Sequence, residues 1–481
     1  MTRRTATRIL LATGVAPLGR TQERTPRKIT AGAPQIFVDL ADVESLENVG
    51  QIFHAAEKHP ANPILRGTKS WEREAGGPAA SFIYDADEKL FKCWYQGVMG
   101  DKEGATQYGP HTLCYATSAD GIVWQRPSLN LHEIEGSRQN NVVVPPDYHE
   151  GQDHWESVMK DPGDSDPARR YKGFGWSSLT RGLHTMTSPD GLRWTHSLEP
   201  VVKGVGDAQS MMIDSRHRRY VVFLRSKVRL YSVSEDFVSW SKPEPSLQPP
   251  LGQAGGATLY NHMGFAYGDQ YLGFVSYFHM KSDNRYHPRM DLRVLTSRDG
   301  LHYEMPGPLP HDRPPVVRCG DLGEWDRFMT MLTGAPPIRR ENRLYIYYRG
   351  MSRRHKPFGL PIDKDTYESG ALGLATIRVD GFASLASGFD GGRVTTRPFV
   401  FDHGTLRVNA KADFGRIAIE ALDESQEPIP GFSEKDCAPL HGDHVEQPVR
   451  WEGADLRSLV GRPIRLRFHL SNARLYSYSV T

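Results

Sequence analysis

Cysteine is scarce in this sequence, with four residues among 481, and no two of them form a C-x-x-C pair. The absence of that spacing argues against a zinc site and against a thioredoxin-like redox site. Cys93 and Cys114 lie in apolar stretches with the character of strands, so we interpret them as buried thiols.

Long apolar runs and an excess of one charge are also absent. No stretch approaches the roughly 18 apolar residues that identify a membrane-spanning helix. The 59 basic residues are balanced by 57 acidic ones, for a formal net charge of +2. Proteins that bind nucleic acid normally carry a basic excess on one face. We therefore predict neither a membrane span nor a nucleic-acid partner.

The signatures of two large enzyme classes are missing as well. Residues 204–207 do not form a G-x-G-x-x-G run that opens a helix, so no dinucleotide site is predicted. No G-x-S-x-G elbow occurs, which argues against a serine hydrolase of the α/β type. The acidic run at 161–167 lacks EF-hand spacing and is interpreted as an exposed turn. We predict no cofactor and no bound metal.

Glycine and proline are plentiful, with 46 and 34 residues, which indicates many turns and is typical of all-β proteins. One turn motif recurs along the chain. Residues 118–124 read S-x-D-G-x-x-W, 188–194 repeat it, 297–303 end in tyrosine, and 234–240 lack the glycine. Asp-Gly supports a tight turn because glycine accepts a positive φ. We expect a hairpin at each copy, with its aromatic residue packed between neighbouring sheets.

A second repeat consists of two short strands joined by a turn. It occurs at 81–85 with 91–95, 157–161 with 170–174, 211–214 with 219–223, 263–267 with 271–275, and 335–338 with 343–348. Five units of about four short strands each are typical of propeller blades. We therefore predict an all-β chain whose residues 29–394 form a five-bladed β-propeller with an N-terminal arm.

The repeat stops near residue 390. Residues 406–410, 417–422 and 464–470 alternate between apolar and polar side chains, as half-buried strands do. We predict a small C-terminal β-sandwich over 395–481.

Four acidic residues stand shortly before the predicted inner strands: Glu72, Glu156, Asp207 and Asp326. Inner strands line the central channel of a propeller, so these side chains are expected to converge on one pocket. Glycoside hydrolysis uses two carboxyl groups, one of which stays protonated near neutral pH because of burial and a neighbouring charge. The simpler interpretation of each is a solvated loop carboxylate or a strand-end cap.

Candidate substrate-binding residues lie close to the same positions. They are Trp155, Trp325, Arg225, Arg349, His262 and His355. The arginines and histidines could hold sugar hydroxyls or a substrate carboxylate or sulfate, and the tryptophans could stack on a sugar face. Salt bridges between blades and core packing are the alternatives.

The hairpin motif and the three Trp-acid pairs at residues 71–72, 155–156 and 325–326 resemble the arabinanase, levansucrase and invertase superfamily of propeller glycosidases. Residues 113–127, 140–143 and 474–478 resemble a bacterial invertase-like branch of it. The N-D-P-N-G and R-D-P runs of invertases are absent.

The resemblance covers about residues 60–481. It implies three carboxylates on successive blades: a base or nucleophile, a modulator of pKa, and an acid. Glu72, Glu156 and Asp207 match by blade position, with Asp326 as a fourth candidate.

These observations predict a glycoside hydrolase that acts on a carbohydrate through paired carboxylates in the central propeller pocket. A non-catalytic propeller that binds carbohydrate or protein is the main alternative, since propellers host many functions. A lyase or a phosphorylase is a third reading. A phosphorylase would need several basic residues around the carboxylates.

The first 28 residues contain seven basic residues and one acidic residue, with an apolar stretch at 9–18. This pattern resembles an export signal, including one of the twin-arginine kind, although a disordered basic tail is the alternative. We expect removal of roughly the first 20–30 residues and an exported protein. Mass spectrometry of the protein from its native host tests this, and an intact Met1 on cytosolic protein would contradict it.

Overall fold

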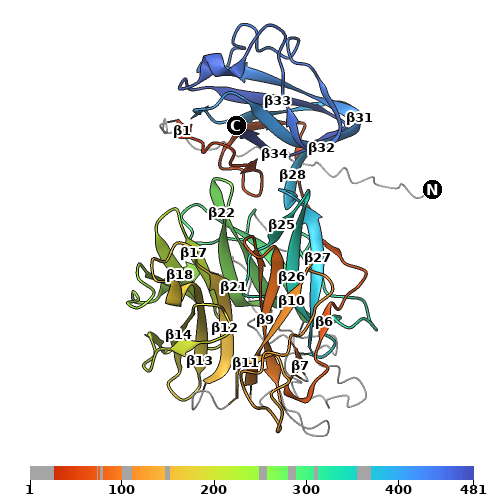
Figure 1. Cartoon of the computed structure of the whole chain (residues 1–481). Helices are drawn as coiled ribbons and strands as arrows, with labels where there is room; N and C mark the ends of the chain where they lie inside the picture. The colour runs from red at the N-terminus through yellow and green to blue at the C-terminus, as the bar shows by residue number, and fades with distance from the viewer. Residues whose placement is uncertain are drawn as a thin grey trace, which may run out of the picture.

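The computed structural model describes residues 26–72, 74–75, 80–99, 111–146, 152–248, 257–279, 289–307, 313–354 and 370–481. Regular structure in these ranges is β-strand, apart from short 3-10 helices such as Ser70–Glu72 and Leu456–Leu459. In the described part of the chain, no helix has both the length and the hydrophobicity of a transmembrane segment. The predicted all-β class is confirmed (Figure 1).

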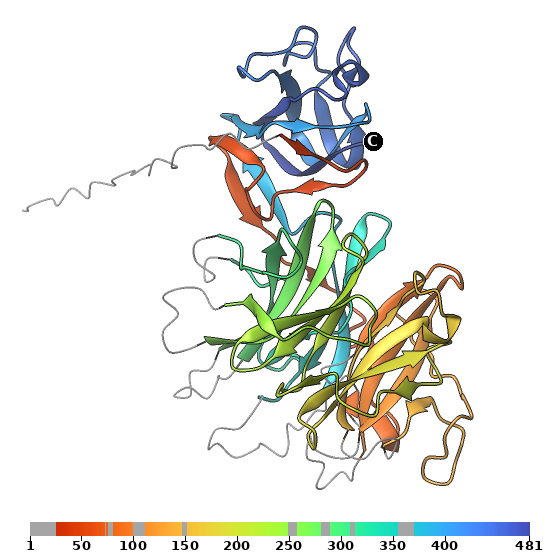
Figure 2. The same ribbon diagram turned by 90° about the vertical axis from the view of Figure 1, so that its left-hand side faces the viewer.

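Most of the chain forms five antiparallel blades (Figures 1 and 2). Blade one contains β8 (Ser81–Asp85), β9 (Leu90–Val98), β10 (His111–Ser118) and β11 (Val142–Val144). Blade two contains β12 (Gln152–Lys160), β13 (Tyr171–Ser177), β14 (Gly182–Ser188) and β15 (Thr195–His196). Blade three contains β17 (Ser210–Asp214), β18 (Arg219–Arg225), β19 (Arg229–Ser234) and β20 (Glu244–Leu247). Blade four contains β21 (Ala257–Tyr267), β22 (Gln270–His279) and β23 (Arg289–Ser297). Blade five contains β24 (Met329–Leu332), β25 (Ile338–Arg340), β26 (Arg343–Met351) and β27 (Ala371–Arg378). The five blades predicted from the repeats are confirmed.

The inner strand of blade five differs from the prediction. The sequence pattern predicts it at 335–338, whereas β24 ends at Leu332 and β25 begins at Ile338. Pro336 and Pro337 lie between the two strands. Proline has no N–H to donate to a neighbouring strand, so the pairing is interrupted there.

Hydrogen bonds between neighbouring blades hold the ring together near its axis. They join Val158 N to Ser81 Oγ (2.8 Å), Ser210 Oγ to His262 O (2.7 Å), Leu332 N to Ser276 Oγ (3.2 Å) and Gly334 N to Ala80 O (2.7 Å). The N-terminal segment completes the ring, because β5 (Glu57–Lys58) and β6 (Leu65–Arg66) pair antiparallel with β27 of blade five. Each of these strands has two residues, too few to show a period in the sequence.

The S-x-D-G turns have one geometry in all four copies. In the blade-two copy, Ser188 Oγ accepts the Gly191 N–H at 2.8 Å, and Asp190 Oδ1 accepts the next two backbone N–H groups. Gly191 has a φ of +77°. The copy without glycine keeps the same hydrogen bonds and holds Phe237 at a φ of +62°. Hydrogen bonding of serine and aspartate to the turn backbone therefore sets this conformation, even where glycine is absent.

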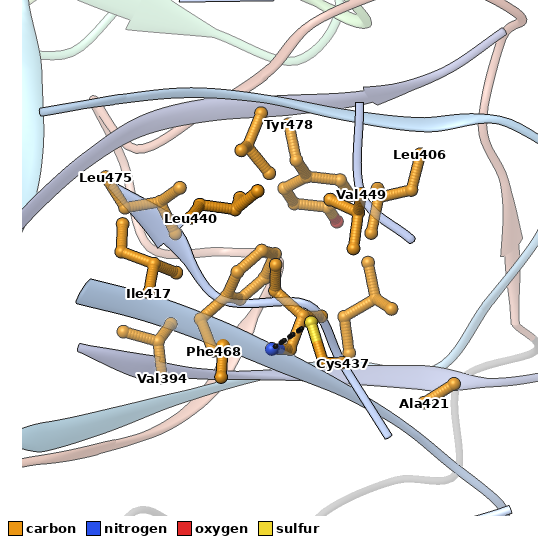
Figure 3. Close-up of a cluster of buried hydrophobic side chains, with 14 of the residues drawn as sticks. Val394, Leu406, Ile417, Ala421, Cys437, Leu440, Val449, Phe468, Leu475 and Tyr478 are labelled. Atoms are coloured by element: carbon orange, nitrogen blue, oxygen red, sulfur yellow. Dashed lines mark hydrogen bonds between the residues drawn. The ribbon is translucent and has the colours of Figure 1, made fainter. Parts of the chain in front are cut away.

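The C-terminal β-sandwich is built on the long strand β31 (Leu406–Leu422). Its first part pairs with β34 (Ala473–Val480) and its second part with β33 (Arg465–Ser471). Apolar side chains from these strands, such as Phe468 and Leu475, fill one core (Figure 3). Cys437 lies in this core, and the four cysteines of the chain are all buried thiols, as interpreted for Cys93 and Cys114.

The N-terminal arm also contributes strands to the sandwich. There, β3 (Val43–Glu47) pairs with β29 (Gly392–Thr396), and β4 (Gly50–Phe53) pairs with β28 (Ala383–Ser387). The predicted domain boundary at residue 395 falls inside β29, whose residues on both sides of that boundary pair with β3 and β33 of the same sheet. The sequence pattern could not reveal the pairing of β3 and β4 because their partners lie more than 300 residues away along the chain.

The sandwich packs on the end of the propeller that carries the turns of blade four. Asp269, in the β21–β22 turn, accepts the Thr30 N–H at 2.9 Å, and Arg298 of the S-x-D-G turn pairs with Asp42 at 2.8 Å. Figures 1 and 2 show the C-terminal strands on this one side of the blades. The opposite end of the propeller is therefore left for a functional site.

Two glycines share a φ of +77° but differ in their surroundings. Gly191 lies in the S-x-D-G turn of blade two, and Gly136 lies in a separate turn between Ile134 and Ser137. A Cβ on Gly191 would lie 2.6 Å from Trp94 Cζ2, whereas a Cβ on Gly136 would have no atom within 4 Å. We expect Gly136→Ala to lower the free energy of unfolding by about 1 kcal/mol, the cost of the left-handed conformation. Gly191→Ala should lower it further, because the ring of Trp94 must move. Denaturant unfolding measures both, and equal losses would contradict this account.

Candidate functional site

Four polar side chains lie next to one another at the end of the propeller opposite the sandwich, and a fifth, Arg349, is near enough for its charge to act on one of them, His154. They come from the starts of inner strands, the ends of second strands and the starts of third strands. We call them the loop-end cluster: His111, His154, Asp207, Arg225 and Arg349. They belong to blades one, two, three and five, so only ring closure brings them together.

Short distances and electrostatic effects connect the members of the loop-end cluster. The rings of His111 and His154 have centroids 4.9 Å apart, and His154 Nε2 lies 3.7 Å from Asp207 Oδ2. Burial lowers the pKa of His154 to about 3, and the charges of His111, Arg349 and Arg225 lower it in the same direction. His154 is therefore neutral at physiological pH.

Asp207 is held by Arg225 from two sides. The guanidinium forms an ion pair with the Asp207 carboxylate, and its Nε donates to the Asp207 carbonyl at 2.9 Å. The same guanidinium lies over the ring of Tyr260, 4.7 Å from its centroid. The Asp207 side chain nevertheless keeps 23% of its surface exposed. It is thus an oriented carboxylate that solvent or a ligand can reach.

Glu156 lies directly behind Asp207 and is fully buried. Its two oxygens accept the backbone N–H groups of Ala208 and Gln209, each at 2.9 Å. Ala208 has a φ of +66°, an unfavourable conformation for alanine that these hydrogen bonds help to hold. Burial raises the pKa of Glu156 to about 7, although the two N–H groups and Arg225 act in the opposite direction. Glu156 therefore positions the segment that carries Asp207.

The other two predicted carboxylates are buried beside cations of their own. Glu72 forms an ion pair with Arg126 at 2.8 Å and a hydrogen bond with the Tyr95 hydroxyl. Asp326 forms an ion pair with Lys58 at 2.6 Å and accepts the Tyr348 hydroxyl at 2.9 Å. The structure thus brings Glu156 and Asp207 together and gives Glu72 and Asp326 the contacts of structural ion pairs.

Three predicted substrate-binding residues serve packing in this structure. Trp155 is buried in the core between blades one and two, and Trp325 stacks on Tyr348 with centroids 5.8 Å apart. His262 is buried, and its Nε2 lies 2.9 Å from Ser246 Oγ. Burial lowers the pKa of His262 to about 3. His355 lies outside the described residues.

Two members of the loop-end cluster were not among the predicted site residues. His154 directly precedes the Trp-Glu pair of blade two, and His111 opens the third strand of blade one. Sequence reasoning that considers only the residues before inner strands misses His111, because His111 lies at the start of a third strand. The better signal is the set of polar residues at every strand end on the same side of the ring.

The charge of the loop-end cluster is positive. Arg225 and Arg349 contribute two positive charges and Asp207 one negative charge, while His154 is neutral. Such a site favours a ligand that carries negative charge. Within the described ranges, no group of three or more histidine, cysteine, aspartate or glutamate side chains is arranged to hold a metal ion.

No protein-family model and no curated protein sequence matches this chain. Solved structures with a similar backbone include a member of the GH130 family of mannoside phosphorylases, a family that contains glycoside hydrolases targeting β-1,2 mannosidic linkages in Candida mannan. It has 15% identity and a TM-score of 0.47, and the match covers 68% of this chain and 94% of that chain.

Two further similar structures have different activities. A glycosyl hydrolase from Bacteroides ovatus has 15% identity and a TM-score of 0.44, with 68% of this chain and 94% of that chain covered. An N-acetylgalactosamine deacetylase from F. plautii has 11% identity and a TM-score of 0.44, with 70% and 96% covered. Identities and TM-scores this low do not identify the reaction of this chain.

The buried Glu156 predicts a defined dependence of stability on pH. Its pKa rises from 4.5 to about 7 on folding, so the folded protein keeps a proton that the unfolded chain releases. The resulting stabilisation is fully present below pH 4.5 and is lost as the pH rises to about 7. Between pH 5 and 8 we expect the free energy of unfolding of wild type to fall by about 2 kcal/mol more than that of Glu156→Gln. Chemical denaturation of both proteins at each pH measures this. If the free energies of unfolding of the two proteins change equally with pH, the prediction is wrong, and the two N–H groups keep Glu156 ionised.

Proposed function

We propose that the loop-end cluster cleaves a glycosidic bond, with Asp207 as the catalytic carboxylate. One observation supports this assignment above others. Asp207 alone among the four predicted carboxylates is substantially exposed, and it lies where side chains from four blades meet. A scaffold has no need to hold an accessible carboxylate and two arginines at its axis.

The surroundings of Asp207 suit the charge changes of glycoside cleavage. The transition state resembles an oxocarbenium ion, which a nearby carboxylate stabilises. In hydrolysis, Asp207 takes a proton from the attacking water, whose oxygen bonds to the anomeric carbon. The bond from that carbon to the leaving oxygen breaks, and the leaving oxygen takes a proton from solvent water at this accessible site. Glu156 acts through Asp207 as a positioning residue, because its oxygens are both occupied by backbone N–H groups.

Phosphorolysis is a second candidate, favoured by Arg225 beside Asp207 and by the positive charge of Arg349, which acts on the neighbouring His154. An oxygen of inorganic phosphate would form the new bond to the anomeric carbon. The bond from that carbon to the leaving oxygen would break, and the leaving oxygen would take the proton that the incoming dihydrogen phosphate gives up, passed on through Asp207. Phosphate then replaces the second carboxyl group, and Arg225 and Arg349 would supply the positive charge that it requires.

Replacement of Asp207 by asparagine tests the assignment. We expect Asp207→Asn to lower the rate of glycoside cleavage by about 100- to 10,000-fold, because the amide can neither take up nor give a proton. The control is Glu199→Gln, whose side chain is 88% exposed and which should keep the wild-type rate. Melting temperatures confirm that each variant is folded.

The assay follows the products from a panel of glycosides with and without inorganic phosphate. Cleavage that requires phosphate and yields a sugar 1-phosphate identifies phosphorolysis, and cleavage without phosphate identifies hydrolysis. A folded Asp207→Asn protein with the wild-type rate would refute the role of Asp207. No cleavage of any glycoside by wild type would favour the non-catalytic alternative.

A further inference from the structure

A pocket of about 510 Å³ lies in the C-terminal sandwich. Several separate segments form it: the β3–β4 turn at Asn48, the β28–β29 turn with Phe389 and Gly391, the β31–β32 connection at Glu434, and the end of β33 at His469. Strand β31 adds Arg416. None of these residues belongs to the loop-end cluster, and the sandwich packs on the opposite end of the propeller.

One exposed phenylalanine lines this pocket, and a second lies on β31, the strand that contributes Arg416. Phe389 lines it with 76% of its surface exposed, and Phe414 is 87% exposed. Phe414 lies two positions before Arg416 on β31, in a stretch where the pairing of this strand with β32 is irregular. The β33–β34 turn ties the two segments together, because Asn472 donates to the backbone carbonyls of Phe414 and Gly388 at 3.1 and 2.8 Å.

A ligand that covers the exposed phenyl ring of Phe389 would remove its apolar surface from water, which favours binding. A flat ring beside a polar pocket suits a ligand with one apolar face and many hydroxyls. Sugar rings have this character, because their axial C–H groups form an apolar face while the hydroxyls project from the edge.

Most charged groups of the pocket are paired with each other, and Asp390 adds a further carboxylate to the lining. Arg393 forms an ion pair with Glu47, Arg416 Nη2 lies 3.4 Å from Glu434 Oε1, and His469 Nδ1 lies 3.4 Å from Glu434 Oε2. Positive and negative groups therefore nearly balance, unlike in the loop-end cluster. Such a lining offers both donors and acceptors to hydroxyl groups and favours a neutral ligand over an ionic one.

We propose that this pocket is a second, non-catalytic binding site for neutral carbohydrate. Phe389 provides the stacking surface, and the Arg416–Glu434 pair provides hydrogen bonds to hydroxyl groups. The site lies on the side of the molecule away from the loop-end cluster. It would hold the protein on a polysaccharide while the loop-end cluster stays free.

Affinity electrophoresis of the full chain tests the proposal. The gels contain neutral polysaccharides, namely mannan, arabinan, xylan and mixed-linkage β-glucan, and in a separate lane set the anionic polymer pectate. We expect at least one neutral polysaccharide to retard the wild-type protein. Phe389→Ala and Arg416→Ala should remove most of that retardation. Leu198→Ala is the matched control, since Leu198 is an apolar side chain 82% exposed on blade two, and it should migrate like wild type.

The outcomes separate this site from the proposed catalytic site. Asp207→Asn should be retarded as strongly as wild type, so loss of cleavage and loss of binding are independent results. Absence of retardation by every neutral polysaccharide would overturn the proposal. Retardation by pectate alone, or retardation unchanged in folded Phe389→Ala and Arg416→Ala proteins, would overturn it as well.

Discussion

The pairing of β5 and β6 with β27 is the constraint on which the rest of this structure depends. It supplies the outer strands of blade five from the N-terminal segment and so closes the ring of five blades. Lys58 from β5 then reaches Asp326, and Asn62 from the following turn accepts the Leu374 N–H at 2.8 Å. The remainder of the N-terminal segment joins the sandwich. One stretch of chain therefore fixes both the ring and its attachment to the C-terminal strands.

Ring closure determines what the buried charges do. Ions taken out of water need a partner in good geometry, and removing one partner leaves a costly unpaired charge. Glu72 with Arg126, and Asp326 with Lys58, satisfy this rule inside or between blades. Glu156 is different, because its partners are backbone N–H groups and not a cation. That arrangement leaves Arg225 free to orient Asp207, and it links a buried acid to an accessible one.

The two ends of the molecule differ in charge and in surface character. The loop-end cluster is positive and gathers one accessible carboxylate, whereas the sandwich pocket has charges of both signs and one exposed phenyl ring. The propeller lies between them and keeps the two sites apart.

The sequence by itself determined the all-β class, the number of blades and the hairpin turns. Each S-x-D-G turn is stabilised by hydrogen bonds within a few residues, so the local sequence carries all the information for it. The position of Asp207 just before an inner strand could be predicted for the same reason. The sequence pattern predicts Glu156 before an inner strand, but Glu156 lies inside β12, which begins earlier than that pattern predicts. Only the tertiary structure decided which carboxylates are accessible. Arg126 and Lys58 are far along the chain from Glu72 and Asp326, and local patterns do not specify pairing between distant segments. The recruitment of β3 and β4 into the sandwich, and the place of His111 beside His154, depend on the same long-range closure.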